Sequence, residues 1–432
     1  MAVATAISDE GAVDVRDRGD VRRQIRLVSV FGLVLLALVF FYLKIDDFGV
    51  KYTLGERVTK DDPAKDLDAQ TIMIAGLVVV AVALLLAVVN KVPKGALGGL
   101  IYFLVGVAFF AGFVFWNYAD QTGTFSVAII NPFPGTIRLA TPLIFGALAG
   151  CLCERAGVIN IAIEGQFLMG AFFASVASSL AFSAEMGLVG GIAAGVAMAA
   201  LLGVFALRYQ VNQVVLGVVL IALATGLTDF LLSQIPDDPD IKKYLNEPLI
   251  LEKVPVSGLV DIPVIGPALF NQTILVYIMY GSVVFVTLLL FQTTWGLRVR
   301  SVGEHPKAAD TVGINVNRIR WQAVLIGGVF AGLGGAFFTV GSTGTFDSNA
   351  SAGNGFIALA AVIMGRWHPV GATLASLLFG FCFTLQAQLA FLDKIPGELL
   401  RASPYLVTVI AVAGFVGRVR PPAADGEPYV KS

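Results

Sequence analysis

Long apolar runs, separated by shorter polar segments, occupy most of the chain. A transmembrane helix needs about 20 mostly apolar residues, and this rule predicts twelve spans. The spans are 27–43, 71–90, 97–116, 136–153, 158–182, 188–207, 211–232, 272–291, 321–341, 355–365, 370–391 and 403–417. The run 355–365 is too short to cross a bilayer upright, so we interpret it as a half-helix. The pattern predicts an all-α polytopic membrane protein, a helical bundle of about twelve spans.

Composition supports this class. Hydrophobic residues make up 57% of the chain and charged residues 14%, whereas a soluble domain has about 45–50% and about 25%. So few charges cannot cover a soluble surface of this size. The net charge of −1 is not the basic balance of a nucleic-acid binder. We therefore expect a lipid bilayer around the protein and no nucleic-acid partner.

The distribution of positive charge predicts the orientation. If all twelve spans cross, both termini share one side, and most of the 29 Lys and Arg residues lie on that side. The positive-inside rule then predicts N-in and C-in, with cytoplasmic tails at 1–26 and 418–432. Arginines precede the run 27–43 and no small-residue cleavage site follows it. This favours an uncleaved signal anchor over a cleaved signal peptide.

Two polar excursions are expected on the external side. Segment 44–70 is rich in acids and indicates a solvated loop. Segment 233–271 contains prolines, aspartates and glycines and indicates an ordered loop with one short helix. The second loop is either a plain connector or a docking site for an external partner.

Small residues recur at four-residue spacing inside several spans. Close backbone packing holds helices together in lipid, where no hydrophobic force acts between them. The pattern therefore predicts tight helix pairs through Gly146 and Gly150, through Gly187, Gly191 and Gly195, and through Gly328 and Gly332.

Segment 292–320 is the longest expected cytoplasmic loop and carries several arginines. Pro306 suits the first position of a helix, and Gly313 suits the position just past a helix end. These start and end signals predict a helix over 306–312, about 10 Å long. The loop is either a basic anchor at the lipid surface or a rigid knob that fits another protein.

Polar residues interrupt the apolar pattern at 154–170. Asn160 and Glu164 are four apart, so a helix would place them on one face, and Gln166 follows. A carboxylate at membrane depth needs a partner or water, and the glycines here permit a broken helix that lines a cavity. Glu164 either lies near the cytoplasmic edge and pairs with Arg155 or another cation, or it contacts the transported solute.

Segment 341–356 is small, polar and nearly uncharged, and it leads into the short run 355–365. Its side chains include Asn349 and Asn354. Such a segment is either a cluster of turns or a source of backbone and amide hydrogen bonds for a neutral ligand.

Catalytic motifs are missing from the sequence. There is no G-x-x-x-x-G-K-[ST], H-E-x-x-H or G-x-S-x-G pattern. His305 and His368 are the only histidines, and Cys151 and Cys153 are too close in sequence for a metal or redox motif. We expect no catalytic site, no metal and no cofactor bound by this chain.

Three motifs, in this order, resemble one family. The first runs from Cys153 to Gln166, the second combines Val302–Ala309 with Gly313–Val316 and Gly327–Ala336, and the third runs from Gly355 to Trp367. They resemble the permease subunits of bacterial ABC importers for ribose-type sugars, branched-chain amino acids and nucleosides. The first and third look closest to the nucleoside-uptake branch.

The resemblance covers 136–417 and implies a type II ABC importer permease-like core with broken helices there, preceded by N-terminal spans over 27–135. It implies a coupling contact with an ATPase through Glu304, Pro306, Lys307, Ala308, Ala309 and Gly313. The candidate substrate pathway contains Asn160, Glu164, Gln166, Asn349 and Asn354. His305 departs from the small polar residue common before the proline, which implies a weaker helix cap.

The resemblance also implies the partners. They are a second permease subunit (a related chain or a copy of itself), a cytoplasmic ABC ATPase that uses ATP, and an external substrate-binding lipoprotein. The function implied is import of a neutral polar solute across the bacterial cytoplasmic membrane by alternating access, with a nucleoside favoured and a simple sugar next. An ion-coupled secondary transporter and a permease for branched-chain amino acids remain alternatives, and a membrane enzyme is the least supported class.

Overall fold

The computed structural model of the chain describes residues 18–53, 65–119, 127–128, 132–236, 238, 241, 244–262, 265–390, 396–410 and 420–430. The chain divides into two compact units, Met1–Ile129 and Ile130–Ser432. Each unit is described by itself.

Ten helices in the described residues are long and apolar enough to cross a membrane. This confirms the predicted class of all-α polytopic membrane protein. The segment predicted as a half-helix forms the shorter apolar helix α14 (Asn354–Met364). The predicted span 403–417 lies partly outside the described residues, and its first part belongs to α16 (Gly397–Ile410).

The first unit is built from three apolar helices, α1 (Arg18–Leu43), α2 (Ala69–Val88) and α3 (Ala96–Tyr118). Their shared core is aliphatic and aromatic, and Phe41 stacks on Trp116 with ring centroids 4.9 Å apart. Asp68 caps α2, because its carboxylate accepts hydrogen bonds from the backbone N–H groups of Gln70 and Thr71.

The connection between α1 and α2 is more regular than the predicted solvated loop. Strand β1 (Gly49–Thr53) pairs antiparallel with β2 (Lys65–Asp68) and parallel with β3 (Val127–Ala128), in the order β2-β1-β3. The prediction of a solvated loop over 44–70 did not include these strands. The stretch contains β-forming Val50, Tyr52 and Thr53, a signal that the acidic residues around it obscured.

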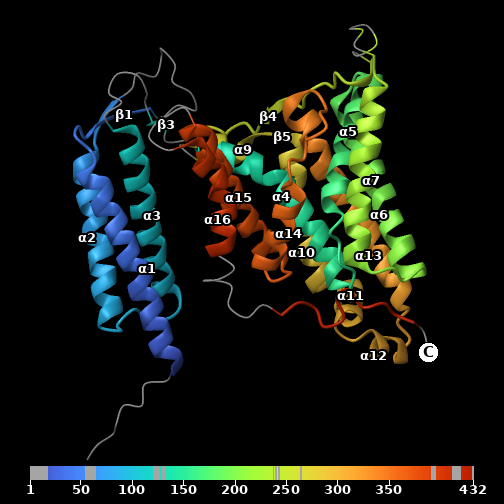
Figure 1. Cartoon of the computed structure of the whole chain (residues 1–432), viewed down its shortest axis with the longest axis horizontal. Coiled ribbons are helices and arrows are strands. Elements are labelled where there is room, and N and C mark those ends of the chain that lie inside the picture. Colours follow the sequence, from blue (N-terminus) through green and yellow to red (C-terminus); the bar gives the residue numbers. More distant parts are fainter. Residues whose placement is uncertain are drawn as a thin grey trace, which may run out of the picture. The chain divides into compact units, whose positions relative to one another are not determined.

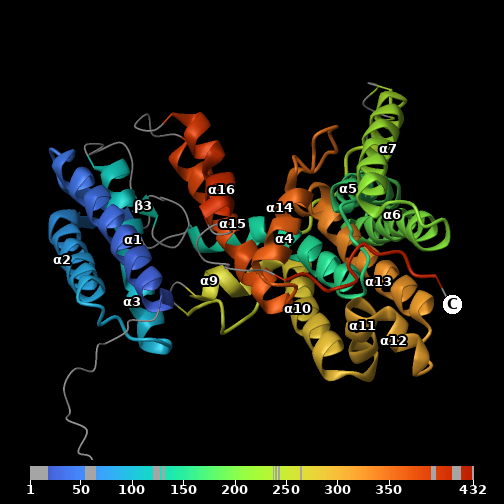
Figure 2. The ribbon, with the colours of Figure 1, turned by 60° about the horizontal axis from the view of Figure 1, so that its bottom comes forward.

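The second unit holds the remaining elements. In chain order they are α4 (Pro132–Arg155), α5 (Ile163–Ala181), α6 (Ala184–Gly203), the π-helical turn η1 (Val204–Arg208), α7 (Gln213–Ser233), β4 (Lys253–Pro255), α9 (Ile265–Phe270), β5 (Asn271–Thr273), α10 (Ile274–Gln292), α11 (Thr294–Glu304), α12 (Pro306–Thr311), α13 (Val316–Phe337), the π-helical turn η2 (Thr339–Thr343), α14, α15 (Pro369–Leu389) and α16. Helices α4 and α13 form its centre and are the most deeply buried of the long apolar helices in the described residues. Helix α15 packs on α4, and α5 and α6 pack on α13 (Figures 1 and 2).

Glycine contacts confirm the predicted packing of small residues. Helices α6 and α13 meet backbone to backbone, because a Cβ added at Gly195 would collide with the carbonyl of Gly328 and one at Gly332 with the carbonyl of Gly191. On α4, a Cβ at Gly146 would collide with Phe167 and Ala358. These close approaches place α4, α5 and α14 around the site described below.

The loop predicted over 233–271 is ordered in its described part. Strands β4 and β5 pair antiparallel, and α9 is the expected short helix. Buried Asn246 joins this loop to the rest of the unit, because its Oδ1 atom accepts hydrogen bonds from Ser175 Oγ and from the backbone N–H of Phe346, each 2.8 Å long. The loop therefore packs on α5 and on the segment after η2.

Candidate transport pocket and coupling surface

The helical structure is interrupted between α4 and α5, as predicted. Gly157 has φ +82°, a conformation that favours glycine, and α5 begins only at Ile163. Asn160 therefore lies in the turn rather than on the helix, so the expectation that it shares a helical face with Glu164 was wrong. Asn160 instead donates a hydrogen bond of 3.1 Å to Gln166 Oε1, and both side chains are fully buried.

Glu164 is held by three donors that lie far from it in the sequence. Its Oε1 atom accepts hydrogen bonds from Ser351 Oγ at 2.5 Å and from the Gly353 backbone N–H at 2.9 Å. Its Oε2 atom accepts one from the Gly355 backbone N–H at 2.6 Å. Gly353 and Gly355 belong to the N-terminus of α14, where unpaired N–H groups and the helix dipole stabilise an anion.

The alternative that Glu164 pairs with Arg155 was wrong. The Arg155 guanidinium donates to the carbonyls of Trp367 at 2.9 Å and Arg366 at 3.2 Å. Glu164 can approach α14 so closely because Gly355 has no side chain: a Cβ there would lie 2.5 Å from the Glu164 Cα atom. The carboxylate therefore fixes where α14 begins.

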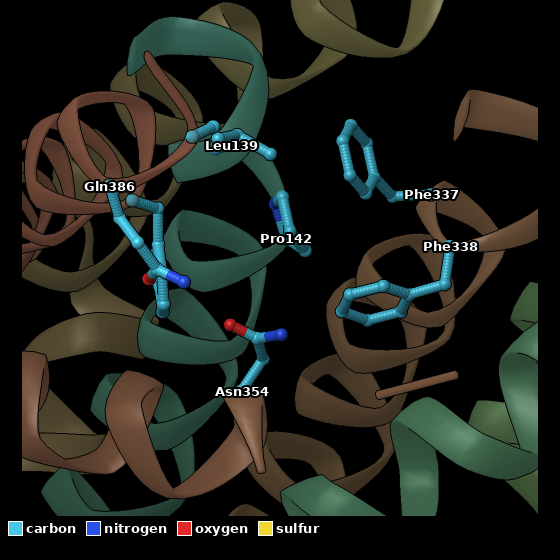
Figure 3. Close-up of a pocket in the computed structure, with 8 residues that line it drawn as sticks. Leu139, Pro142, Phe337, Phe338, Asn354 and Gln386 are labelled. Atoms are coloured by element: carbon cyan, nitrogen blue, oxygen red, sulfur yellow. The ribbon is translucent and has the colours of Figure 1, made fainter. Parts of the chain in front are cut away.

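An open pocket of about 240 Å³ lies beside this helix start. It is lined by Leu139 and Pro142 of α4, by Phe337 at the end of α13 and Phe338 directly after it, by Asn354 of α14, and by Phe383, Gln386 and Ala387 of α15. Figure 3 shows the Asn354 amide and the Phe338 ring directed into the same space, with Pro142 on the side of α4 that faces Phe337. None of these eight residues is charged.

The polar groups of the pocket are two carboxamides. Asn354 donates one hydrogen bond of 2.8 Å to the Ser351 carbonyl. A carboxamide has two N–H donors and an acceptor oxygen, so Asn354 keeps hydrogen-bonding capacity for a ligand. Gln386 brings a second carboxamide from α15. A mostly apolar, aromatic pocket with a few converging polar groups is typical of small-molecule sites.

The predicted pathway residues thus take different places. Asn354 lines the pocket, Glu164 positions the helix that carries it, and Asn160 and Gln166 are buried against each other. Asn349 lies exposed in a turn, where its backbone N–H donates to Asp347 Oδ1 at 2.7 Å.

Sequence reasoning missed Phe338, Pro142 and Gln386. Pro142 inside the apolar run 136–153 was an available signal, since a proline leaves a helical carbonyl unpaired. Gln386 inside the run 370–391 was another, because an amide in an apolar span needs a partner.

The loop 292–320 contains two helices where one was predicted. Helix α12 is the expected one: Pro306 is at its start, and the side chain of His305 makes no cap hydrogen bond. Gly313 ends it with φ +83°. The N–H groups of Gly313 and Ile314 bond to the carbonyls of Asp310 and Ala309, at 2.9 and 3.1 Å, which is the Schellman pattern.

Helix α11 was not predicted, because charged residues obscure its pattern. Its start is capped by Thr293, whose Oγ1 accepts a hydrogen bond of 3.0 Å from the Gly296 N–H. Helices α11 and α12 together form the end of the second unit shown at the bottom of Figure 1.

The residues predicted for coupling do not all face outward. Glu304, Lys307 and Ala308 are exposed, and Val312 just beyond α12 is 76% exposed. Ala309 is only 4% exposed, so its side chain packs inside this chain. The exposed surface of α12 and Val312 is called the coupling knob below.

Comparison with known proteins adds independent information. Residues 134–413 match the family described as branched-chain amino acid transport system, permease component. The chain is 40% identical over 309 residues to the guanosine ABC transporter permease protein NupQ of Bacillus subtilis, covering 69% of this chain and 96% of that protein.

Two further relatives carry related names. The nucleoside ABC transporter permease protein NupC of Lactococcus lactis is 39% identical over 304 residues, covering 68% of this chain and 94% of that protein. The putative glucose ABC transporter permease protein TsgC13 of Haloferax volcanii is 33% identical over 263 residues, covering 61% and 78%. No solved structure matches the chain.

Proposed function

Because this chain belongs to the family of permease components of branched-chain amino acid transport systems, we propose that it is the membrane-spanning subunit of an ATP-driven importer of nucleosides. Members of this family are permeases, and this chain is a multi-pass membrane protein with ten long apolar helices in its described residues. The chain forms the route for the solute, and a partner ATPase hydrolyses ATP.

The proposal of a nucleoside as the cargo rests on the uncharged, aromatic pocket. A nucleobase stacked on a phenylalanine such as Phe338 gains about 1–3 kcal/mol, and its polar edges and ribose hydroxyls match the carboxamides of Asn354 and Gln386. A zwitterionic amino acid would need charged partners, since an unpaired buried charge is costly, and no lining residue is charged. The names of two relatives, for guanosine and for nucleosides, support the same choice.

The coupling knob supports the arrangement of the complex. A large apolar side chain such as Val312, 76% exposed beside a short rigid helix, suits a protein partner better than water. We assign this surface to a cytoplasmic ABC ATPase. A second permease subunit, related or identical, and an external substrate-binding lipoprotein complete the assembly.

The orientation proposed is N-in and C-in. The backbone N–H of Ala424 donates to the carbonyl of Gly303 at the end of α11, so the C-terminal segment and the coupling knob lie at one end of the second unit. A knob that meets a cytoplasmic ATPase thus places the C-terminus in the cytoplasm, in agreement with the distribution of Lys and Arg.

Uptake in proteoliposomes tests the function. The chain is reconstituted with the ATPase, the second permease and the lipoprotein proposed above, and labelled guanosine, uridine, glucose and leucine are offered separately. We expect guanosine and uridine to be taken up only when ATP is present on the knob side. Uptake driven by a sodium or proton gradient without ATP would show an ion-coupled carrier, and uptake of leucine alone would show an amino-acid permease.

Two neighbouring alanines test the coupling knob. Ala308→Asp places a charge on the exposed surface of α12, where desolvation in an ATPase contact is costly. We expect the variant to fold with unchanged thermal stability but to lose co-purification with the ATPase. Ala309→Asp puts the charge at a buried position and should lower thermal stability in the isolated chain. Retention of the ATPase by Ala308→Asp would contradict the docking role.

A further inference from the structure

The C-terminal residues 420–430, called the strap, cross the end of the second unit that carries the coupling knob. Figure 1 shows this red segment passing α11 on the side of α12. The backbone N–H of Ala424 donates to the Gly303 carbonyl at 2.9 Å. The backbone N–H of Ala423 donates to Glu304 Oε2 at 3.3 Å. The strap is thus tied to the end of α11, immediately before α12.

The strap also reaches α12 itself. Tyr429 is 8% exposed and packs into the main core cluster of the unit, and its hydroxyl interacts electrostatically with the Asp310 carboxylate of α12. Ala424 is 3% exposed. A terminal segment that buries an aromatic ring and bonds through its backbone is docked at a defined place.

A second set of bonds ties the strap to the break between α4 and α5. The backbone N–H of Gly426 donates to the Gly157 carbonyl at 3.3 Å. Arg320 of α13 is fully buried and donates from Nε to the Ala156 carbonyl at 3.1 Å and from Nη1 to the Glu427 carbonyl at 2.8 Å. One guanidinium therefore clamps the strap and the turn together.

The turn held in this way leads directly into α5. Seven residues after Gly157, Glu164 fixes the start of α14, and α14 presents Asn354 to the pocket. The strap is consequently bonded at one end of this series to the last residues of α11, immediately before the coupling knob, and at the other to the turn that supports the pocket.

We propose that the strap is a positioning element for transport, which ties movement of α12 to the turn between α4 and α5 and so to the pocket. A segment that only covered apolar surface would contribute to stability alone. A segment that transmits movement also sets how much solute is carried for each ATP hydrolysed. The inference rests on the coupling role proposed above for α12, and the experiment separates the two.

Cysteine labelling tests whether the strap is docked, without reference to any cargo. The native cysteines are replaced by serine, and single cysteines are introduced at adjacent positions in the assembled complex: Ala424→Cys at the buried site and Ala423→Cys at the exposed one. We expect a maleimide to label position 424 at least about tenfold more slowly than 423, since labelling requires local opening. Addition of Tyr429→Ala should speed labelling at 424 and leave 423 unchanged. Equal labelling rates in the parent complex would overturn the proposal.

The coupling ratio tests the role in transport. In proteoliposomes, Tyr429→Ala should reduce guanosine uptake per ATP hydrolysed by about fivefold, while ATP hydrolysis and association with the ATPase persist. Tyr429→Phe keeps the ring and loses only the hydroxyl that interacts with Asp310, so its reduction should be smaller. Val430→Ala, at a neighbouring exposed position, is the matched control.

The outcomes are distinct. An unchanged coupling ratio in Tyr429→Ala overturns the strap proposal while the transport function stands. No guanosine uptake by the parent complex contradicts the cargo instead; the labelling experiment still tests docking, and the ratio is then measured with whichever solute is carried.

Discussion

Two buried ionic side chains in the second unit, Glu164 and Arg320, make most of their hydrogen bonds to backbone groups. Glu164 accepts from two N–H groups at the start of α14 and from the Ser351 hydroxyl. Arg320 donates to one carbonyl in the turn before α5 and one in the strap. Each charge therefore holds a non-helical segment in place, and each does so across a large distance in the sequence.

The two sites differ in how completely they are satisfied. Both Glu164 oxygens have donors, whereas Arg320 Nη2 is a buried atom without a hydrogen-bond partner within the described part of the chain. A buried charge with unmet hydrogen-bonding capacity is less stable than a satisfied one. We therefore expect α14 to be held more firmly than the strap, which suits a pocket wall and a moving contact respectively.

The largest effect is expected at Glu164. Glu164→Ala leaves the N–H groups of Gly353 and Gly355 without an acceptor, at about 1–3 kcal/mol for each buried group. Glu164→Gln leaves one of them facing an amide N–H₂, because a carboxamide has one oxygen. We expect uptake to be nearly abolished in the first variant and reduced at least about tenfold in the second. The measurement is guanosine uptake at equal amounts of inserted protein.

A second change checks that position, not charge, is what matters. Gly355→Ala keeps the carboxylate but forces α14 away from α5, because the new Cβ would lie 2.5 Å from the Glu164 Cα atom. It should impair uptake as Glu164→Gln does. Normal uptake in Glu164→Gln and Gly355→Ala would mean that α14 need not be held here.

Glu164 also shows where the sequence alone was insufficient. The cost of a carboxylate in a membrane span predicted that it needs a partner, and the glycines predicted the broken helix. The nearest cation in sequence, Arg155, was the only partner that local reasoning could supply. The true partners lie in 351–355 and depend on how α14 folds back, which no local pattern encodes.

The next largest effect is expected at Arg320. Arg320→Lys replaces the planar guanidinium, whose Nε and Nη1 donate to the carbonyls of Ala156 and Glu427, by one ammonium that cannot reproduce this geometry. The two hydrogen bonds should therefore weaken. We expect about a fivefold loss of uptake per ATP hydrolysed, with ATP hydrolysis retained. Labelling at Ala424→Cys should speed up in the same variant. If Arg320→Lys lowered both uptake and hydrolysis in proportion, the two buried charges would serve the same purpose and the contrast between them would fail.

A smaller effect is expected in the pocket, opposite the helix that Glu164 positions. Phe338→Ala removes an aromatic surface worth about 1–3 kcal/mol to a stacked base, whereas Phe338→Tyr retains it. We expect the first variant to raise the KM for guanosine about fivefold or more, with ATP hydrolysis coupled normally. Gln386→Ala should weaken guanosine in the same way. A change in coupling ratio instead of KM would place Phe338 in the moving machinery.

Local helix-start and helix-end residues predicted α12 well, but no local signal predicted the strap. Pro306 and Gly313 mark the ends of α12 by their own backbone chemistry, and the structure confirms both. The strap is an irregular segment whose position depends on Arg320, Gly303 and Gly157, each more than 100 residues away in sequence. Pattern analysis treated it as a cytoplasmic tail because irregular docked segments have no periodicity.

The smallest effect is a dependence of strap docking on pH, through Asp425. Burial raises the pKa of Asp425 to about 7, against the opposing influence of the Arg320 charge and a hydrogen bond from the backbone of Gly426. Glu154 of α4 also interacts electrostatically with Asp425. The docked pKa lies above the usual value of 3.8, so docking favours the protonated acid. Its contribution to docking is complete at low pH and is lost as the pH rises through about 7.

Labelling of Ala424→Cys relative to Ala423→Cys measures this dependence, because the ratio cancels the pH dependence of thiol reactivity. We expect the ratio to rise between roughly pH 6 and 8, since ionised Asp425 loosens the strap. Asp425→Asn stays neutral and should flatten the profile at its low-pH level. A flat parent profile, or an equal rise in Asp425→Asn, would place the release of the strap under the control of α12 and Arg320 alone.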